Sequence, residues 1–178
     1  MKKILTLAAF ALCFAGCGQA QTEKNAATTT EKNVQSHVRI VDTAIPGDYV
    51  VEEIAKTFKG KVVLIDFWAT WCGPCRMAMK QIHDIKPELT EKGVVFAYVT
   101  GEFSPEDEWT KMIADIDGQH YRLTKEQWHD LRESLGIPGI PAYLLLGKDG
   151  KPAYDNLSEG GYPGSEVLKN NIEVALGK

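Results

Sequence analysis

Two cysteines separated by two residues, Cys72 and Cys75, are the side chains of this sequence best suited to covalent chemistry. They follow an apolar run that predicts a strand, and the residues after them have helical spacing. A thiol at such a junction lies beside unpaired backbone N–H groups and the positive end of the helix dipole, which favour its thiolate form. Gly73 and Pro74, between the cysteines, fit a tight turn into a helix. The pattern predicts that Cys72 attacks in thiol-disulfide exchange and that Cys75 resolves.

Other roles for the two cysteines have weaker support. A disulfide across so short a loop adds little stability, because it removes little entropy from the unfolded chain. A zinc site needs four ligands, and the sequence after Cys17 offers no cysteine besides Cys72 and Cys75 and no ligand spacing among His83, His120 and His129. Covalent haem requires a histidine directly after the second cysteine, where Arg76 stands. We expect no metal and no cofactor other than the redox-active disulfide; a structural or vestigial disulfide in a binding module is the alternative.

An acidic residue, Asp66, lies inside the run Lys61–Trp68. This run is apolar on both alternating faces, which is typical of a central strand covered on both sides. A carboxylate in such a strand loses its hydration, so its pKa should rise, and it can then move a proton to or from Cys75 during exchange. We predict a catalytic role for Asp66, with a hydrogen-bonded structural aspartate near a strand end as the alternative.

The N-terminus has the layout of a secretory signal. Lys2 and Lys3 precede the apolar run 4–14, and two small residues follow it. The run is about half the length of the roughly 20 residues that a membrane-spanning helix needs. We therefore predict that residues 1–16 are a signal peptide, which directs export and is then removed.

Cys17 follows the predicted signal, and the sequence from Phe14 to Cys17 resembles a bacterial lipoprotein signal. This resemblance implies that Cys17 is lipidated and anchors an exported protein to a membrane of the periplasmic space. Ordinary cleavage that leaves a free Cys17 is the alternative. Residues 18–36 contain a single large apolar residue, Val34, so residues 17–36 are expected to be the lipidated cysteine and a flexible tether.

The charge of the mature chain excludes one class of partner. The sequence has a formal net charge of −4, and loss of Lys2 and Lys3 with the signal makes it −6, with 18 of the 20 basic residues left against 24 acidic ones. Such a chain lacks the electrostatic features of a nucleic-acid-binding protein. Residues 37–178 suffice for one domain with a hydrophobic core, and no later segment predicts a membrane span.

Strand and helix patterns alternate through residues 37–178. Expected strands cover 37–42, 61–68, 94–99, 120–123, 142–146 and 152–157, and expected helices cover 50–58, 72–86, 104 onward, 124–136 and 165–176. Asp149 and Gly150 predict a tight turn that makes the last two strands an antiparallel hairpin. The alternation favours a parallel sheet with helices on its faces, and the hairpin makes the sheet mixed.

Local signals predict where several helices begin and end. Ser104, which a proline follows, is expected to cap one helix, and Ser165 is expected to cap the last one. Thr124 and Gln127 form a capping-box pattern for a helix that ends at a glycine. Pro87 is expected to break or kink the helix that begins at the cysteine pair.

Two motifs resemble those of the thioredoxin superfamily. The stretch Val63–Cys75, which reads VLIDFWATWCGPC, resembles the active-site strand and turn. The stretch Gly136–Pro141, which reads GIPGIP, resembles the substrate-facing loop. The resemblance implies a thioredoxin-like α/β fold with a mixed central β-sheet and helices on both faces. It also places Asp66 at the position of the buried acid of the family.

The same resemblance implies a substrate-binding edge. In the family, the proline at the position of Pro141 is cis, and the residue before it, here Ile140, pairs with the substrate backbone; the earlier proline of the loop is the other candidate. Trp71, Gly73 and Pro74, which surround the cysteines, are expected to contact substrates as well. For Trp71, packing in the core or at the rim is the alternative.

The export signal, the tether and the extra segment 101–124 resemble more closely the membrane-bound TlpA and ResA branch of the superfamily. This resemblance implies a protein that reduces or exchanges disulfides outside the cytoplasm, and some members serve cytochrome c maturation. Two positions depart from the pattern. Ala78 stands where many ResA-like proteins carry a glutamate, and Lys80 stands where a helix proline is usual.

The sequence thus predicts an extracytoplasmic thiol-disulfide oxidoreductase that reduces protein disulfides through Cys72 and Cys75. Its expected partners are protein disulfide substrates, an upstream thiol electron donor and, through the lipid, a membrane. A disulfide oxidant or isomerase is the alternative within this class, and peroxide reduction is weaker because no peroxidatic cysteine signature is present. Outside enzymes, the alternative is a redox-inactive tethered adaptor that uses the fold to bind proteins.

Overall fold

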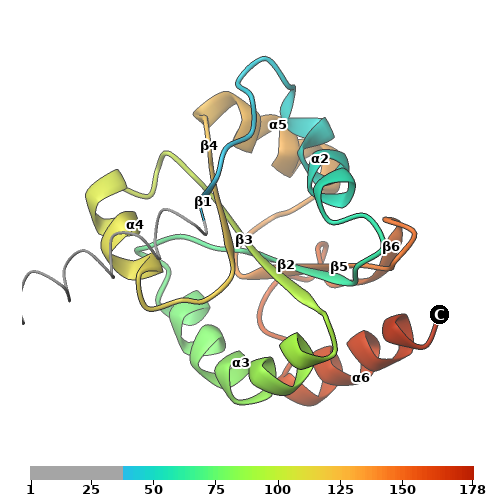
Figure 1. Cartoon of the computed structure of the whole chain (residues 1–178). Helices are drawn as coiled ribbons and strands as arrows, with labels where there is room; N and C mark the ends of the chain where they lie inside the picture. The colour runs from blue at the N-terminus through green and yellow to red at the C-terminus, as the bar shows by residue number, and fades with distance from the viewer. Residues whose placement is uncertain (1–37) are drawn as a thin grey trace, which may run out of the picture.

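Six strands form one β-sheet in the computed structural model, which describes residues 38–178 (Figure 1). The strands are β1 (Val38–Arg39), β2 (Val63–Phe67), β3 (Val95–Gly101), β4 (Gln119–Leu123), β5 (Ala142–Leu146) and β6 (Pro152–Asp155). Their order in the sheet is β1-β4-β3-β2-β5-β6. The pairs among β1 to β4 are parallel, whereas β5 is antiparallel to both β2 and β6. The predicted mixed sheet with a terminal hairpin is confirmed.

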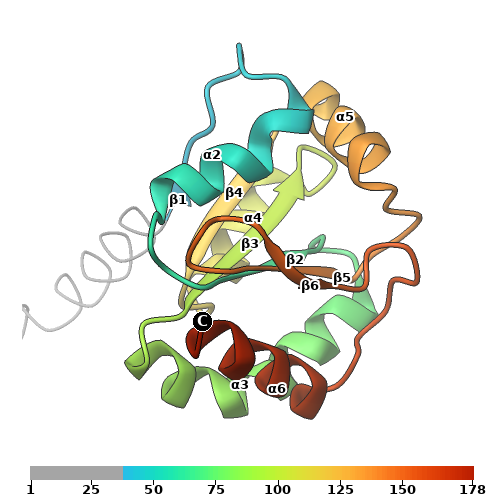
Figure 2. The ribbon, with the colours of Figure 1, turned by 90° about the vertical axis from the view of Figure 1, so that its right-hand side faces the viewer.

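Helices cover both faces of this sheet. They are the short 3₁₀ helix η1 (Gly47–Tyr49), α2 (Val50–Thr57), α3 (Gly73–Glu91), α4 (Glu106–Ile113), α5 (Lys125–Leu135) and α6 (Ser165–Leu176). Figure 2 shows α2 and α5 on one face and α3 and α6 on the other. The predicted α/β arrangement with helices on both faces is therefore confirmed.

The expected signal peptide (1–16), Cys17 and the expected tether (17–36) lie outside the described residues. Within residues 38–178, none of the helices has the length and apolar character needed to cross a membrane.

The strand β2 carries Asp66 and leads to the cysteine pair, and all five of its residues are buried. Its two edges are paired with β3 and β5, which places it at the centre of the sheet. Val63, Ile65 and Phe67 belong to the core that includes α2 and α5. Leu64 belongs to the other core, which includes α3 and α6. Burial of one such side chain contributes about 1.5–3 kcal/mol, so this strand fixes the start of the loop that follows it.

The segment 101–124, expected to be an insertion, forms α4 and β4. Because β4 pairs with β3 on one side and β1 on the other, the segment is an integral part of the sheet. Trp109 and Ile113, from α4, are buried in the same core as the inner face of α3. The segment therefore packs into the layer that supports the cysteine pair.

Helix ends show where local signals succeed and fail. The capping box of Thr124 and Gln127 is confirmed, and α5 ends where Gly136 adopts a left-handed conformation with φ 63°. Pro87, in contrast, does not end α3, which continues to Glu91. Leu89 in the last turn is fully buried, and its burial offsets the loss of the hydrogen bond that the proline cannot make.

The two predicted serine caps are wrong, because neither side chain bonds to the start of its helix. α4 begins after Pro105, and the Ser104 hydroxyl instead accepts the backbone N–H of Thr70 at 3.1 Å. Ser165 is the first residue of α6, and its hydroxyl lies 2.6 Å from the hydroxyl of Tyr162. In both cases the serine hydroxyl bonds to a residue outside the helix rather than to the helix end, as the local sequence had predicted.

Candidate active site

A disulfide joins Cys72 and Cys75 at the N-terminus of α3. Cys72 is the N-cap residue, and its Sγ atom accepts the backbone N–H of Cys75 at 3.2 Å. Gly73 and Pro74 occupy the first two helical positions, where no backbone N–H is needed for a helical bond. Cys72 is 4% exposed and Cys75 is 0% exposed, so Cys72 is the outer cysteine. This is the geometry that an attacking Cys72 and a resolving Cys75 require, since the N–H group at Cys72 also favours its thiolate.

The loop 137–141 packs beside the outer cysteine. The Ile140–Pro141 peptide bond is cis, as the family resemblance implied, whereas the bond before Pro138 is trans. The carbonyl oxygen of Ile140 lies 3.9 Å from Cys72 Sγ. Pro141 is buried and Ile140 is half-buried. The backbone at Ile140 is therefore next to the outer sulfur atom of the pair.

Asp66 lies on the face of β2 that points toward α3. It lies on the same face as Leu64 and Trp68, which belong to the core that also contains Cys75. Its side chain is 2% exposed, and neither carboxylate oxygen has a hydrogen-bond partner within residues 38–178. Burial raises the pKa of Asp66 well above its usual value, and the nearby charge of Lys86 lowers it by a smaller amount. The predicted burial and pKa direction are confirmed; the catalytic role stays a prediction.

Trp71, directly before Cys72, is 62% exposed. One side of its ring packs against Phe103, with the ring centroids 6.0 Å apart. Phe103 in turn packs against Trp128 at 4.9 Å. Trp128 is buried, whereas Trp71 combines packing on one ring with a surface open to solvent.

Comparisons with known proteins agree with this site. Residues 60–152 match a family described as thioredoxin-like. This chain belongs to the thioredoxin-like family. The matched range contains β2, the cysteine pair, Asp66 and the cis-proline loop.

Curated relatives of this thioredoxin-like chain include proteins named thiol-disulfide oxidoreductase ResA. The protein from Bacillus thuringiensis is 29% identical over 96 residues, which cover 54% of this chain and 54% of the relative. The protein from Oceanobacillus iheyensis is 36% identical over 97 residues, which cover 52% of this chain and 47% of the relative. The chain thus spans about half the length of the curated relatives it matches.

A solved structure shares the fold over a larger part of its length. The thioredoxin domain of a thiol-disulfide oxidoreductase from Bacteroides vulgatus superposes with a TM-score of 0.59 and 28% identity. The match covers 68% of this chain and 83% of that domain. The thioredoxin-like fold predicted from the two motifs is confirmed.

A buried hydroxyl network, which the sequence did not reveal, supports the loop before the cysteines. Ser104 Oγ accepts the N–H of Thr70 at 3.1 Å and lies 2.8 Å from the hydroxyl of Thr100. All three residues are buried. They connect the loop before the cysteines to the end of β3. In the sequence, Ser104 and the proline after it predicted a helix cap and gave no sign of this network.

Arg132, at the end of α5, is a second support that the sequence did not reveal. Its guanidinium donates to the carbonyl oxygen of Ile137 at 2.9 and 3.1 Å and to that of Pro138 at 3.2 Å. These bonds hold the beginning of the cis-proline loop. The sequence signal was a basic residue in the last helical turn, which is typical of helix C-termini generally.

The three candidate histidines come from different elements of the fold. His83 lies on α3, His120 on β4 and His129 on α5. Within residues 38–178, no three His, Cys, Asp or Glu residues lie close enough together to hold a metal ion.

Proposed function

We propose that this thioredoxin-like chain is an exported thiol-disulfide oxidoreductase that reduces protein disulfides outside the cytoplasm. The observation that carries the proposal is the Cys72–Cys75 disulfide at the N-terminus of α3, with the Ile140 carbonyl beside its outer sulfur. The names of the ResA relatives support the same activity. No other cofactor is required, because the cysteine pair itself carries the two electrons.

The reaction proceeds in two exchange steps. The thiolate of reduced Cys72 attacks one sulfur of a substrate disulfide, so a Cys72–substrate bond forms and the other substrate sulfur leaves as a thiolate. Cys75 then attacks Cys72 Sγ, the mixed disulfide breaks, and the second substrate sulfur leaves. Two electrons pass to the substrate, and the cysteine pair becomes the disulfide present in the structure. An upstream thiol donor reduces the pair again.

Cys75 must lose its proton before it can resolve the mixed disulfide, and we assign Asp66 as the base. Both groups face the layer between the sheet and α3, away from bulk water. Burial raises the pKa of Asp66, which brings its proton affinity closer to that of a thiol and makes it a better base. The neutral acid then returns the proton to solvent.

Substrate proteins dock on the surface around the outer sulfur. This surface consists of the exposed ring of Trp71, the helix-start residues Gly73 and Pro74, and the backbone at Ile140 and Pro141. An extended substrate segment can pair with the free edge of the Ile140 backbone while its disulfide meets Cys72.

The membrane anchor rests on the sequence before residue 38. A removed signal at 1–16, lipid on Cys17 and a polar tether at 17–36 would hold the domain at a membrane in the periplasmic space. Cys17→Ser should release the domain in soluble form, whereas mass analysis that finds an unmodified Cys17 in the native protein would contradict the anchor.

Titration against reduced and oxidised glutathione tests the direction of the reaction. A reductant should have a midpoint potential of roughly −270 mV, as thioredoxin has, whereas a strong oxidant has one of roughly −120 mV. A midpoint in the oxidising range would contradict the reducing role and favour an oxidant or isomerase. Cys72→Ser, which cannot form the disulfide, is the control that assigns the signal to this pair.

A further inference from the structure

The loop 137–141, which carries the substrate-pairing edge, is held by hydrogen bonds at both of its ends. At its start, two backbone carbonyl oxygens accept bonds from the guanidinium of Arg132. At its end, the carbonyl oxygen of Pro141 accepts the backbone N–H of Gly161 at 2.7 Å. Within residues 38–178, the backbone N–H of Ile140, between these two attachments, has no hydrogen-bond partner. The loop is therefore fixed on either side of the edge and open at the edge itself.

Arg132 and Ile137 are joined by hydrogen bonds in both directions. The backbone carbonyl oxygen of Arg132 accepts the N–H of Ile137 at 3.0 Å, and its Nε and Nη2 atoms donate to the Ile137 carbonyl oxygen at 3.1 and 2.9 Å. Nη2 also donates to the carbonyl oxygen of Pro138 at 3.2 Å. The chain can turn back in this way because Gly136, between them, has a φ of 63°. The guanidinium thus fixes the loop relative to the end of α5, and a lysine, with a single nitrogen, cannot reproduce its planar set of donors.

The bonds of Arg132 cross a hollow rather than a packed interface. The end of α5 and the start of the loop line a space of about 330 Å³. The carboxylate of Glu133, which lines the same space, lies 3.4 Å from the ring of His129. Within residues 38–178, no carboxylate forms an ion pair with Arg132, so its charge is directed at the two carbonyl oxygens. Because bonds from a charged donor are stronger than those between neutral groups, this one side chain makes the main attachment of the loop to α5.

We propose that Arg132 is a positioning residue for substrate recognition: it holds the backbone of Gly139 and Ile140 where an extended substrate segment pairs with it. This inference rests on the proposed function. The carbonyl oxygen of Ile140 lies 3.9 Å from Cys72 Sγ, so a shift of the loop changes where the substrate backbone lies relative to the attacking sulfur. A preordered edge also binds a substrate more tightly, because less chain entropy is lost when the pairing forms. Arg132 acts through the loop and takes no part in the exchange of electrons.

Arg132→Met tests this inference, because methionine keeps much of the length of the side chain and cannot donate a hydrogen bond. Arg132→Lys keeps the charge and loses the planar set of donors, so its effect should be smaller. If Arg132→Met does not fold, Arg132→Lys carries the same comparison. Thr124→Ala is the control for a general loss of stability, because it removes the capping box at the other end of α5 and leaves the loop untouched.

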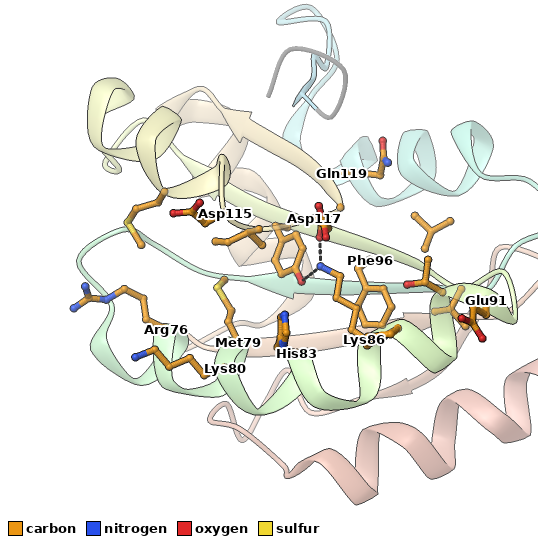
Figure 3. Close-up of a pocket in the computed structure, with 18 residues that line it drawn as sticks. Arg76, Met79, Lys80, His83, Lys86, Glu91, Phe96, Asp115, Asp117 and Gln119 are labelled. Atoms are coloured by element: carbon orange, nitrogen blue, oxygen red, sulfur yellow. Dashed lines mark hydrogen bonds between the residues drawn. The ribbon is translucent and has the colours of Figure 1, made fainter. Parts of the chain in front are cut away.

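A second control, Arg39→Met, lies beside a cleft that is remote from the loop. Arg39 donates to Gln119 at 2.7 Å, and Gln119 lines a space of about 1000 Å³ along α3 (Figure 3). Lys86 crosses this cleft from α3 and donates to the hydroxyl of Tyr98 and to the backbone carbonyl oxygen of Asp117. Among residues 38–178, those that line the cleft include none of the substrate-pairing loop. Arg39→Met therefore removes an exposed arginine that has no contact with the loop.

Two reactions and one spectroscopic quantity are measured on the reduced proteins. Reduction of insulin, with dithiothreitol as the electron donor, gives kcat and KM for a protein disulfide. Reaction with the aromatic disulfide of nitrothiobenzoate gives the rate for a disulfide that has no peptide backbone to pair with Ile140. The NMR order parameters of the Gly139 and Ile140 amides report the fast motion of the edge itself, whether or not a substrate reacts.

We expect Arg132→Met to raise KM for insulin by about tenfold at an unchanged kcat, the size expected when about one further residue must be ordered on binding. The rate with the aromatic disulfide should not change, and the order parameters of Gly139 and Ile140 should fall. Arg132→Lys should give intermediate values of KM and of the order parameters. Thr124→Ala and Arg39→Met should leave KM for insulin unchanged.

An unchanged KM for insulin in Arg132→Met overturns the inference, and so do unchanged order parameters. An equal loss of rate with both disulfides also overturns it, because Arg132 would then act on the cysteine pair rather than on the edge. An equal rise of KM in Thr124→Ala would assign the effect to the stability of α5 and contradict the positioning role. If the reduced parent protein reacts with neither disulfide, the proposed function fails, whereas the order parameters still decide whether Arg132 holds the edge.

Discussion

Replacement of Asp66 by asparagine should stabilise the oxidised protein at neutral pH while it slows resolution in the reduced one. Asp66 is 2% exposed and lies in the central strand, and its oxygens have no hydrogen-bond partner within residues 38–178. Asparagine has nearly the same size and no charge. The variant therefore removes the free-energy cost of holding an ionised carboxylate in the core, and it leaves the packing around residue 66 nearly unchanged.

The pH dependence of this effect follows from the raised pKa of Asp66. In the unfolded chain the carboxyl ionises at about pH 3.9. Below that pH the carboxyl is protonated in both states, so its ionisation costs no stability. Between the unfolded and the folded pKa, the unfolded state ionises first, and the parent loses about 1.4 kcal/mol of unfolding free energy per pH unit relative to the variant. Above the folded pKa the difference stays constant.

Urea unfolding of both oxidised proteins from about pH 3.5 to about pH 8 measures this difference. At the acid end we expect the unfolding free energies of the two proteins to change equally with pH. As the pH rises, the unfolding free energy of Asp66→Asn should increasingly exceed that of the parent. Asp84→Asn, which neutralises an exposed aspartate on α3, is the matched control and should show no such growth. An advantage of Asp66→Asn that is constant across the range would refute the reasoning, because packing rather than ionisation would then explain it.

Three further predictions concern the supports around the site. Ser104→Ala should lower the unfolding free energy by about 1–3 kcal/mol, because it leaves the buried N–H of Thr70 without its acceptor; denaturant unfolding measures this, and an unchanged midpoint would contradict it. Trp71→Ala should lower kcat/KM for a protein disulfide by about tenfold and leave the midpoint potential unchanged, which separates docking from redox chemistry. Thr124→Ala should cost about 1 kcal/mol through loss of the capping box, whereas Thr124→Ser should cost little.

Much of the fold was readable from short-range patterns. The run that became β2 is apolar on both faces because both faces are buried, and the capping box at Thr124 uses only residues three apart in the sequence. The Asp149-Gly150 turn likewise fixed the hairpin of β5 and β6. In each case the interactions that form the element lie within the element or its own turn, so a single sequence is sufficient to find them.

Features that depend on distant partners were not readable. Ser104 has every local mark of a helix cap, but its hydroxyl bonds to Thr70, 34 residues earlier in the chain. The end of α3 depends on the burial of Leu89 in the core, which overrides the signal of Pro87. Lys86 falls on the buried stripe of α3, four residues after Ile82, so the sequence marks it as unusual.

The partners of Lys86, in contrast, are set by the folded chain. Tyr98 and Asp117 lie 12 and 31 residues further on, and only the packing of β3 and the chain before β4 brings them to the ammonium. The same holds for the Ile140 carbonyl, which lies 68 residues from Cys72 in sequence and 3.9 Å from its sulfur. The family resemblance implied that the loop at Ile140 faces the substrate, but the contact between its carbonyl and Cys72 is known only from the folded chain.

Capture of substrates on Cys75→Ser tests the central claim most directly. If Cys72 attacks and Cys75 resolves, the variant has no internal route out of the mixed disulfide, so substrate proteins should accumulate on Cys72 in cells and be released by reductant. Cys72→Ser should capture little, because the remaining thiol is fully buried. If Cys75→Ser captures no partner under conditions in which the parent pair cycles between thiol and disulfide, the exchange mechanism is contradicted and a tethered adaptor becomes the better account.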